Sequence, residues 1–302
     1  LLFEVPPFFS LYYQARKTAM KKLIQSVLIA FLLCLLILPG VSKSKPKNIM
    51  LLFDLKNYNN EIDKTVDHFF NKVISADDQL IVMTPAGKML SYSSKTISAS
   101  PQKVSSEIKD ALKKHTSVTS SDYQNIYNQM MSIVNDIRDG SGLEDTKNLI
   151  AAYENNRKEL KMTRRINEAM LLQFSEVFKR SRQVTGDTDN QIYLFFQEEI
   201  RPIPDKNTMN NIRENPQLSF DAARVFFEEK TEEDFNVDKI AEEFKKAGVT
   251  FNFVYIIPKD LPTQRYQLVD NSGDFYSAMS IIADKTGGKV VTTTQPQEIF
   301  KD

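Results

Sequence analysis

Asp54 is the residue of this sequence that is best placed to do chemistry. It follows the continuous apolar run 49–53, which predicts a buried strand of a parallel sheet covered on both faces. Ligands of α/β proteins bind beyond the carboxyl ends of such strands. The next residues carry an apolar stripe at helical spacing: Ile62, Val66, Phe69, Phe70 and Val73. The sequence therefore predicts a ligand-binding edge of a sheet that contains the Asp54 carboxylate.

Further carboxylates follow a second predicted buried strand, 192–196. Glu198 and Glu199 come just after this strand, and Asp205 lies a few residues beyond them. The ends of neighbouring parallel strands converge, so these acids and Asp54 could form an oxygen-rich site for calcium or magnesium. Paired glutamates after a strand are also common on solvated surfaces. An exposed, metal-free pair is therefore the alternative.

Residues for nucleophilic or zinc-dependent catalysis are scarce. The sequence has two histidines, His68 and His115, which lie far apart, and one cysteine, Cys34, inside an apolar N-terminal segment. It contains no Gly-x-Ser-x-Gly motif and no glycine-rich phosphate loop. His68 lies beside Phe69 near the apolar face of its helix, which favours a packed side chain over a ligand. We expect a protein that is not an enzyme, with a hydrolase that uses an unrecognised carboxylate site as an alternative.

The N-terminal part of the sequence predicts export. Residues 1–19 show no clear periodicity and are interpreted as upstream of the start codon, Met20. Two lysines, an apolar segment and small residues follow, so residues 20–44 are interpreted as a signal peptide and the protein as periplasmic or secreted. An uncleaved N-terminal anchor is the alternative, because about 17 apolar residues lie at the lower edge of membrane-spanning length. A mature chain without cysteine forms no disulfide.

Charge and element order define the class of protein. Removal of residues 1–42 takes four basic residues and one acidic residue from a chain with 39 of each, which leaves a net charge of about −3. A nucleic-acid-binding protein would show a basic excess, so no nucleic-acid partner is expected.

Predicted strands alternate with predicted helices. This order indicates an α/β fold of Rossmann-like type, with a mostly parallel central sheet and helices on both faces.

The middle of the chain is mainly helical in pattern. A helix that starts at Pro101 is predicted to end near His115, and residues 120–182 are almost wholly helical, with a break at 140–142 and a charged, solvated turn over 151–161. Pro202 and Pro204 argue against regular structure near those positions. One helical stripe either packs within a hairpin or binds a partner: Tyr123, Tyr127, Met130, Met131 and Val134.

Four pieces in this order resemble a von Willebrand factor type A (integrin I-type) domain. They are the strand with Asp54 and its helix, the segment Asp-Asp-Gln-Leu-Ile-Val-Met-Thr at 77–84, the strand 192–196, and the late strand from Val249 followed by Ile-Ile-Ala-Asp-Lys-Thr-Gly-Gly-Lys-Val at 281–290. The resemblance implies one domain over 45–302. The helical segment of about 118–160 has no counterpart in the family and is interpreted as an insertion.

The resemblance also implies where a divalent cation would bind. The family holds the cation through Asp-x-Ser-x-Ser after the first strand, a threonine from a later loop and an aspartate after the fourth strand, which together form a hard oxygen cage. Here Lys56 and Tyr58 replace both serines, and Gln197, with Glu198 beside it, stands near the place of the second aspartate. Thr163 matches the threonine approximately. We therefore expect no metal and no other cofactor.

A specific hypothesis follows for Lys56: its ammonium fills the place of the cation and pairs with Asp54. The alternative is a lysine that points into solvent. The candidate ligand-binding residues are all predicted at one end of the sheet: Asp54, Lys56, Asn57, Tyr58, Thr163, Gln197 and Glu198. The expected function is noncatalytic binding of a protein partner in the bacterial envelope. The alternative is magnesium- or calcium-dependent ligand binding through Asp54 and Glu198.

Overall fold

A six-stranded sheet forms the centre of the molecule. The computed structural model describes residues 45–138, 143–185, 188–203, 210, 216–224, 235–258, 267–270 and 272–301. The strand order is β3-β2-β1-β4-β6-β8, and every pairing is parallel except that of β2 with β3. The strands are β1 (Lys47–Asp54), β2 (Gln79–Met83), β3 (Met89–Tyr92), β4 (Asp189–Gln197), β6 (Val249–Ile256) and β8 (Val290–Thr293).

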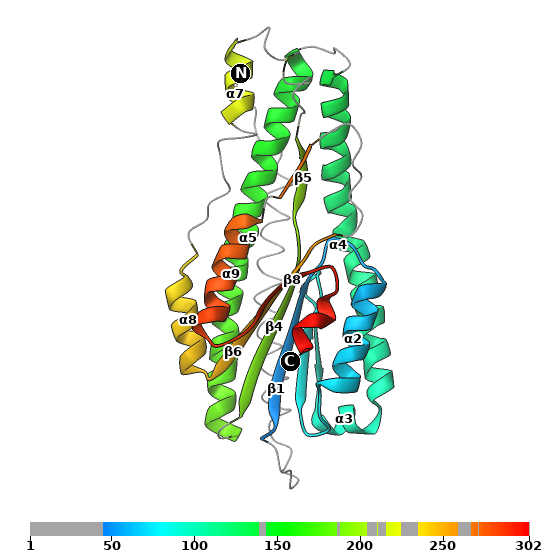
Figure 1. The fold of residues 1–302 in the computed structure, drawn as a ribbon, viewed down its shortest axis with the longest axis vertical. Coiled ribbons are helices and arrows are strands. Elements are labelled where there is room, and N and C mark those ends of the chain that lie inside the picture. The colour runs from blue at the N-terminus through cyan, green and yellow to red at the C-terminus, as the bar shows by residue number, and fades with distance from the viewer. Residues whose placement is uncertain are drawn as a thin grey trace, which may run out of the picture.

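Helices cover both faces of this sheet (Figure 1). The bounds of the described helices are α2 (Asn60–Lys72), α3 (Ser94–Ala99), α4 (Pro101–Arg138), α5 (Leu143–Thr185), α7 (Pro216–Ala223), α8 (Val237–Lys246), α9 (Gly273–Lys285) and the 3-10 helix η2 (Pro296–Phe300). Residues of α5, α8 and α9 pack on one face, and residues of α2, α3, α4 and η2 pack on the other. The predicted α/β class, with a mostly parallel sheet and helices on both faces, is confirmed.

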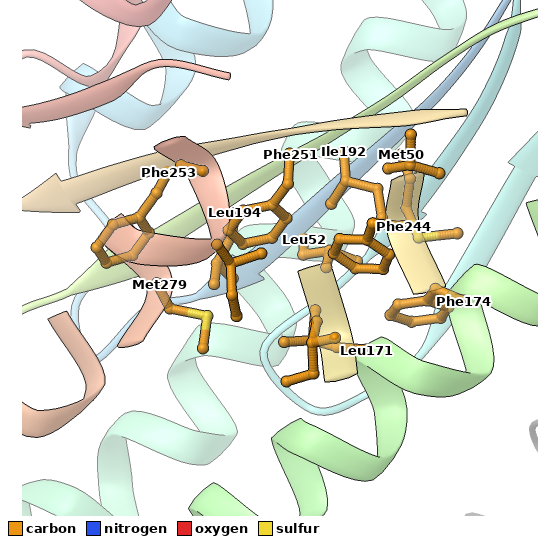
Figure 2. Close-up of a cluster of buried hydrophobic side chains, with 14 of the residues drawn as sticks. Met50, Leu52, Leu171, Phe174, Ile192, Leu194, Phe244, Phe251, Phe253 and Met279 are labelled. Atoms are coloured by element: carbon orange, nitrogen blue, oxygen red, sulfur yellow. The ribbon is translucent and has the colours of Figure 1, made fainter. Parts of the chain in front are cut away.

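The first strand shows why its sequence is continuously apolar. Met50 and Leu52 belong to the cluster beneath α5, α8 and α9, and the alternate residues Ile49, Leu51 and Phe53 belong to the cluster beneath α2 and α4. Successive side chains of a strand point to opposite faces, so a strand covered on both sides must be apolar at every position. Figure 2 shows the first cluster, where phenylalanine side chains of α5, α8 and β6 surround those of β1 and β4.

The two longest helices continue beyond the sheet (Figure 1). There they pack against a two-stranded antiparallel ribbon of β5 (Ile200–Ile203) and β7 (Gln267–Asp270), and against α7. We call this part the arm: residues 118–138 of α4, residues 143–160 of α5, β5, β7 and α7. It has its own apolar cluster, built on Met130, Val134, Leu149, Tyr153, Ile203 and Ala222.

Three sequence-based expectations for this region were wrong. The helix that starts at Pro101 does not end near His115 but runs to Arg138 as α4. The charged segment 151–161 is not a turn, because it lies inside α5, and its lysine, arginine and glutamate residues all favour a helix. Pro202 does lie in a strand, β5, which among the described strands pairs with β7 alone, and at such an edge position the missing N–H costs little.

The predicted signal peptide at 20–44 and the segment 1–19 lie outside the described residues. Within the described part of the chain, no helix combines the length and the apolar character that a membrane crossing requires.

Candidate functional site

The order of the sheet strands reverses between β1 and β4. Successive connections lead from β1 outward to β2 and β3, and from β4 outward to β6 and β8. In doubly wound sheets, the crevice at such a switch point is the usual place for a ligand. β1 ends at Asp54, which lies opposite Phe196 of β4, and β4 ends at Gln197. The structure therefore brings these predicted site residues to one edge of the sheet.

Gln197 ties the two strands together across this crevice. Its buried side-chain oxygen accepts hydrogen bonds from the backbone N–H groups of Lys56, at 2.8 Å, and Asn57, at 2.7 Å. These donors lie in the loop between β1 and α2, where backbone N–H groups have no strand or helix partner. The side-chain amide of Gln197 therefore fixes the course of the loop that carries Lys56. Asn57, in the same loop, is exposed.

Lys56 reaches back into the edge of the sheet. Its Nζ lies 2.9 Å from Asp54 Oδ1 and 3.3 Å from Glu199 Oε1, and 5.8 Å from the centre of the Phe196 ring. The side chain is 18% exposed, against 29% for Asp54 and 6% for Glu199. The predicted pair of Lys56 with Asp54 is present, and the alternative of a lysine that points into solvent is wrong. The pair includes a second carboxylate that the hypothesis did not contain.

Arg164 of α5 extends this network, and the sequence reasoning missed it. Its Nη1 donates to Glu199 Oε2 at 3.2 Å, and its Nε and Nη2 donate to the two oxygens of Asp274 at 2.7 and 2.9 Å. The arginine side chain is 1% exposed. The sequence did contain a signal for this burial. Arg164 lies seven residues before Leu171 and fourteen before Phe178, and residues at this spacing lie on the same face of a helix, here the buried face.

Charges of opposite sign alternate along this network, which we call the edge network: Asp54, Lys56, Glu199, Arg164 and Asp274. Burial by itself would lower the pKa of Lys56, but the carboxylates of Asp54 and Glu199 outweigh that effect and raise the pKa above 10.5. The pKa of Arg164 is raised in the same way, against burial, by Asp274 and Glu199. Both cations therefore stay charged at neutral pH.

Glu198 lies beside the network with a different environment. Burial raises the pKa of this carboxyl, and the nearby charge of Asp270 raises it further. Asp270 accepts hydrogen bonds from the backbone N–H and the hydroxyl of Ser272, and that hydroxyl lies 2.8 Å from the Tyr255 hydroxyl. Ser272 is fully buried, so these contacts hold the connection between β7 and α9 in place.

Two predicted site residues lie apart from these contacts. The Tyr58 hydroxyl donates to Asp63 of α2 at 2.5 Å, and its ring packs on the cluster beneath α2 and α4. Thr163, which the resemblance matches to a loop threonine, lies half-buried inside α5, next to Arg164. Ligand binding by any of these predicted site residues stays a prediction.

The remaining candidates have structural partners or lie outside the described chain. His68 is half-buried and stacks on Phe300 at 6.1 Å, as expected for a packed side chain. His115 Nδ1 lies 2.7 Å from the Thr84 hydroxyl. Met130 and Val134 of the predicted stripe face the arm cluster, which agrees with the packed-hairpin interpretation. Asp205 falls outside the described residues.

A metal ion at the Glu199 carboxylate would have to displace the protein's own cations. Both Glu199 oxygens are engaged, one by Lys56 and one by Arg164. In the described ranges, no group of three or more His, Cys, Asp or Glu side chains is arranged to bind a metal.

The chain matches no protein-family model, no curated protein and no solved structure. The class of the protein is therefore defined by its fold and by the edge network. The protein has an α/β fold with a doubly wound, mostly parallel sheet, and ion pairs bridge the switch point of this sheet. Two long helices extend from the sheet into the arm.

Proposed function

We propose that this chain is an exported, noncatalytic binding module of von Willebrand factor A type, which contacts a protein partner in the bacterial envelope without a divalent cation. The observation that carries the proposal is the position of the Lys56 ammonium, 2.9 Å from Asp54 and 3.3 Å from Glu199. A cation site of the family type needs the carboxylate after the first strand, here Asp54, free to coordinate a metal. In this protein that carboxylate is paired with the Lys56 ammonium.

The arrangement of the sheet supports the same proposal. Asp54 ends the first strand, Gln197 ends the strand across the switch point, and both lie at the edge where the resemblance places the cation. The Gln197 oxygen accepts from two backbone N–H groups, so it already has partners. An amide oxygen in this role supports a fixed surface for a partner more than an open coordination position.

The experiment that tests the proposal measures thermal unfolding of the protein with magnesium, calcium, manganese or a chelator. We expect the midpoint to be the same in all four, because a ligand that does not bind the native state does not stabilise it. A rise with one of the metals that disappears with chelator would overturn the metal-free proposal. It would favour the alternative of metal-dependent binding through Asp54 and Glu198.

Partner contact is tested separately in the envelope of intact cells. A photo-crosslinking residue at Asn57, which is exposed at the edge of the sheet, is compared with one at Lys113, which is exposed on α4. The proposal expects a protein adduct of defined size from position 57 and none of that size from position 113, with or without chelator. Equal adducts from both positions, or none from position 57, would contradict binding at this edge.

One observation favours the alternative of a hydrolase. Glu198 has a raised pKa and lies near a second acid, Asp270, and paired acids of this kind serve in acid–base catalysis. A hydrolase would require that Glu198→Gln abolish turnover of a substrate, and screening the protein against chromogenic ester, peptide and glycoside substrates tests it. Turnover that this variant removes would replace the binding proposal.

A further inference from the structure

The arm and the sheet have separate apolar clusters, and α5 connects them. Tyr153 of this helix belongs to the arm cluster, and Leu171 belongs to the cluster on the sheet. Among the side chains of α5 that are described between these two residues, Arg164 is the buried one. The helix therefore passes from one apolar cluster to the other at a buried cation.

The two acceptors of Arg164 stand where the ribbon of the arm begins and ends. Glu199 directly precedes β5, and Asp274 lies in the first turn of α9, shortly after β7. Asp274 receives two hydrogen bonds from the guanidinium, at 2.7 and 2.9 Å, and Glu199 receives one at 3.2 Å. Since Ile200 pairs with Asp270, the start of β5 and the end of β7 lie at the same end of the ribbon, and one arginine holds this end against α5.

Lys56 connects the same contacts to the sheet. The Glu199 oxygen that is not bound by Arg164 lies 3.3 Å from Lys56 Nζ, which in turn lies 2.9 Å from Asp54 at the end of β1. The backbone N–H of Glu199 also donates to the Ser272 hydroxyl at 3.2 Å, next to the end of β7. Glu199, where β5 begins, is therefore connected to β1 through Lys56, to α5 through Arg164, and to Ser272 just before α9.

We propose that the edge network is an ionic joint that fixes the arm on the sheet, with Arg164 binding the end of the β5–β7 ribbon at which β5 begins and β7 ends. This inference goes beyond the proposed function and does not rest on it. A planar guanidinium that binds a carboxylate through two parallel hydrogen bonds sets an orientation as well as a distance. An apolar contact at the same place would permit sliding and would not set the direction of the arm.

Hydrogen exchange of the full chain, followed by peptide, tests the joint. In Arg164→Gln we expect amides of β5 and β7 to exchange about a hundredfold faster, because removal of one partner leaves buried charges unpaired and local opening becomes easier. Amides of β4 and β6, in the centre of the sheet, should change by less than about threefold. Arg164→Lys, which keeps the charge but not the paired hydrogen bonds, should give an intermediate rate.

Two further variants make the result specific. Arg180→Gln changes an exposed arginine of the same helix and should leave the ribbon unchanged. Asp274→Asn keeps the contact of Arg164 with Glu199, so it should speed exchange in β7 more than in β5 and decides the matter if Arg164→Gln does not fold. Equal acceleration in the ribbon and the sheet, or none in the ribbon, would overturn the joint, because Arg164 would then act on overall stability or not at all.

Discussion

Lys56 lies between two carboxylates that would repel each other without it. Asp54 and Glu199 come from the ends of neighbouring strands, and the ammonium is within 3.3 Å of an oxygen of each. Since the raised pKa of Lys56 lies above its ordinary value of 10.5, the ammonium is fully charged at neutral pH. The stability that it contributes is therefore complete below pH 10.5 and declines only as the pH rises above that value.

Replacement of Lys56 by methionine should destabilise the protein. Methionine keeps most of the apolar stem but leaves Asp54 and Glu199 without this counter-charge, and we expect a loss of about 1–3 kcal/mol, between the values for exposed and fully buried pairs. Lys64→Met is the matched control, because Lys64 pairs with Glu61 at 3.0 Å on the surface and should cost less than about 0.5 kcal/mol. Chemical denaturation measures both, and equal losses would show that the ion pairs of Lys56 stabilise the protein no more than an exposed pair does.

Glu198 should make stability depend on pH in the opposite direction to an ion-paired acid. Burial raises its pKa, so the folded protein binds this proton more tightly than the unfolded chain, and stability falls as the pH rises above the ordinary value of 4.5. Glu198→Gln removes that loss. The variant should be more stable than the wild type at pH 7, and the difference should shrink as the pH falls towards 4.5.

The control for this prediction is Glu242→Gln, an exposed carboxylate of α8. Thermal unfolding between pH 4 and pH 8 compares both variants with the wild type. A Glu198→Gln protein that is less stable at pH 7 would show that the carboxylate makes a favourable contact in the folded state. Burial and the charge of Asp270 would then not be the dominant influences on its pKa.

At the scale of elements, the sequence predicted the buried strands well and the long helices poorly. The apolar runs 49–53 and 192–196 and the predicted late strand from Val249 all lie in strands, because a strand covered on both faces consists mostly of apolar residues. The lengths of α4 and α5 were missed, because the parts of them in the arm share a cluster of few buried side chains and their sequence is rich in charged residues. Such a sequence resembles that of a turn.

The candidate site was predictable to the same extent. Asp54, Lys56 and Gln197 lie near strand ends, and the ends of predicted parallel neighbours had to meet. Arg164 and Asp274 come from α5 and α9, and no local pattern shows that two helices from distant parts of the chain meet at the end of a strand. Pairing across 110 residues is a property of the packed molecule.

The turn between α9 and β8 provides a prediction at this scale. A Cβ atom on Gly288 would lie 1.8 Å from the backbone oxygen of Phe251, in the neighbouring strand β6. Backbone cannot move aside as a side chain can, so Gly288→Ala should cost about 2 kcal/mol or more. Gly273→Ala, where nothing lies within 4 Å, should change stability by less than about 0.5 kcal/mol. Urea denaturation separates the two, and a neutral Gly288→Ala would contradict this close packing of the β6–β8 edge.

At the scale of the whole molecule, the arm depends on helices that are anchored elsewhere. α4 contributes Val104, Ile108 and Leu112 to one face of the sheet, and α5 contributes Leu171 and Phe178 to the other. The two helices then meet beyond the edge of the sheet, where they share a much smaller cluster. A small cluster on well-anchored helices should open locally at a lower free energy than the sheet does.

Two matched leucine substitutions test this division. Leu149 and Leu52 are both fully buried, the first in the arm cluster and the second in the sheet. Leu52→Ala should lower the free energy of global unfolding by about 2–5 kcal/mol. Leu149→Ala should leave the main calorimetric transition nearly unchanged and speed proteolysis within the arm, because the arm then opens without the sheet. If Leu149→Ala instead lowers the main transition as much as Leu52→Ala does, the arm and the sheet unfold as one cooperative unit, and a partner that binds the arm would stabilise the whole protein.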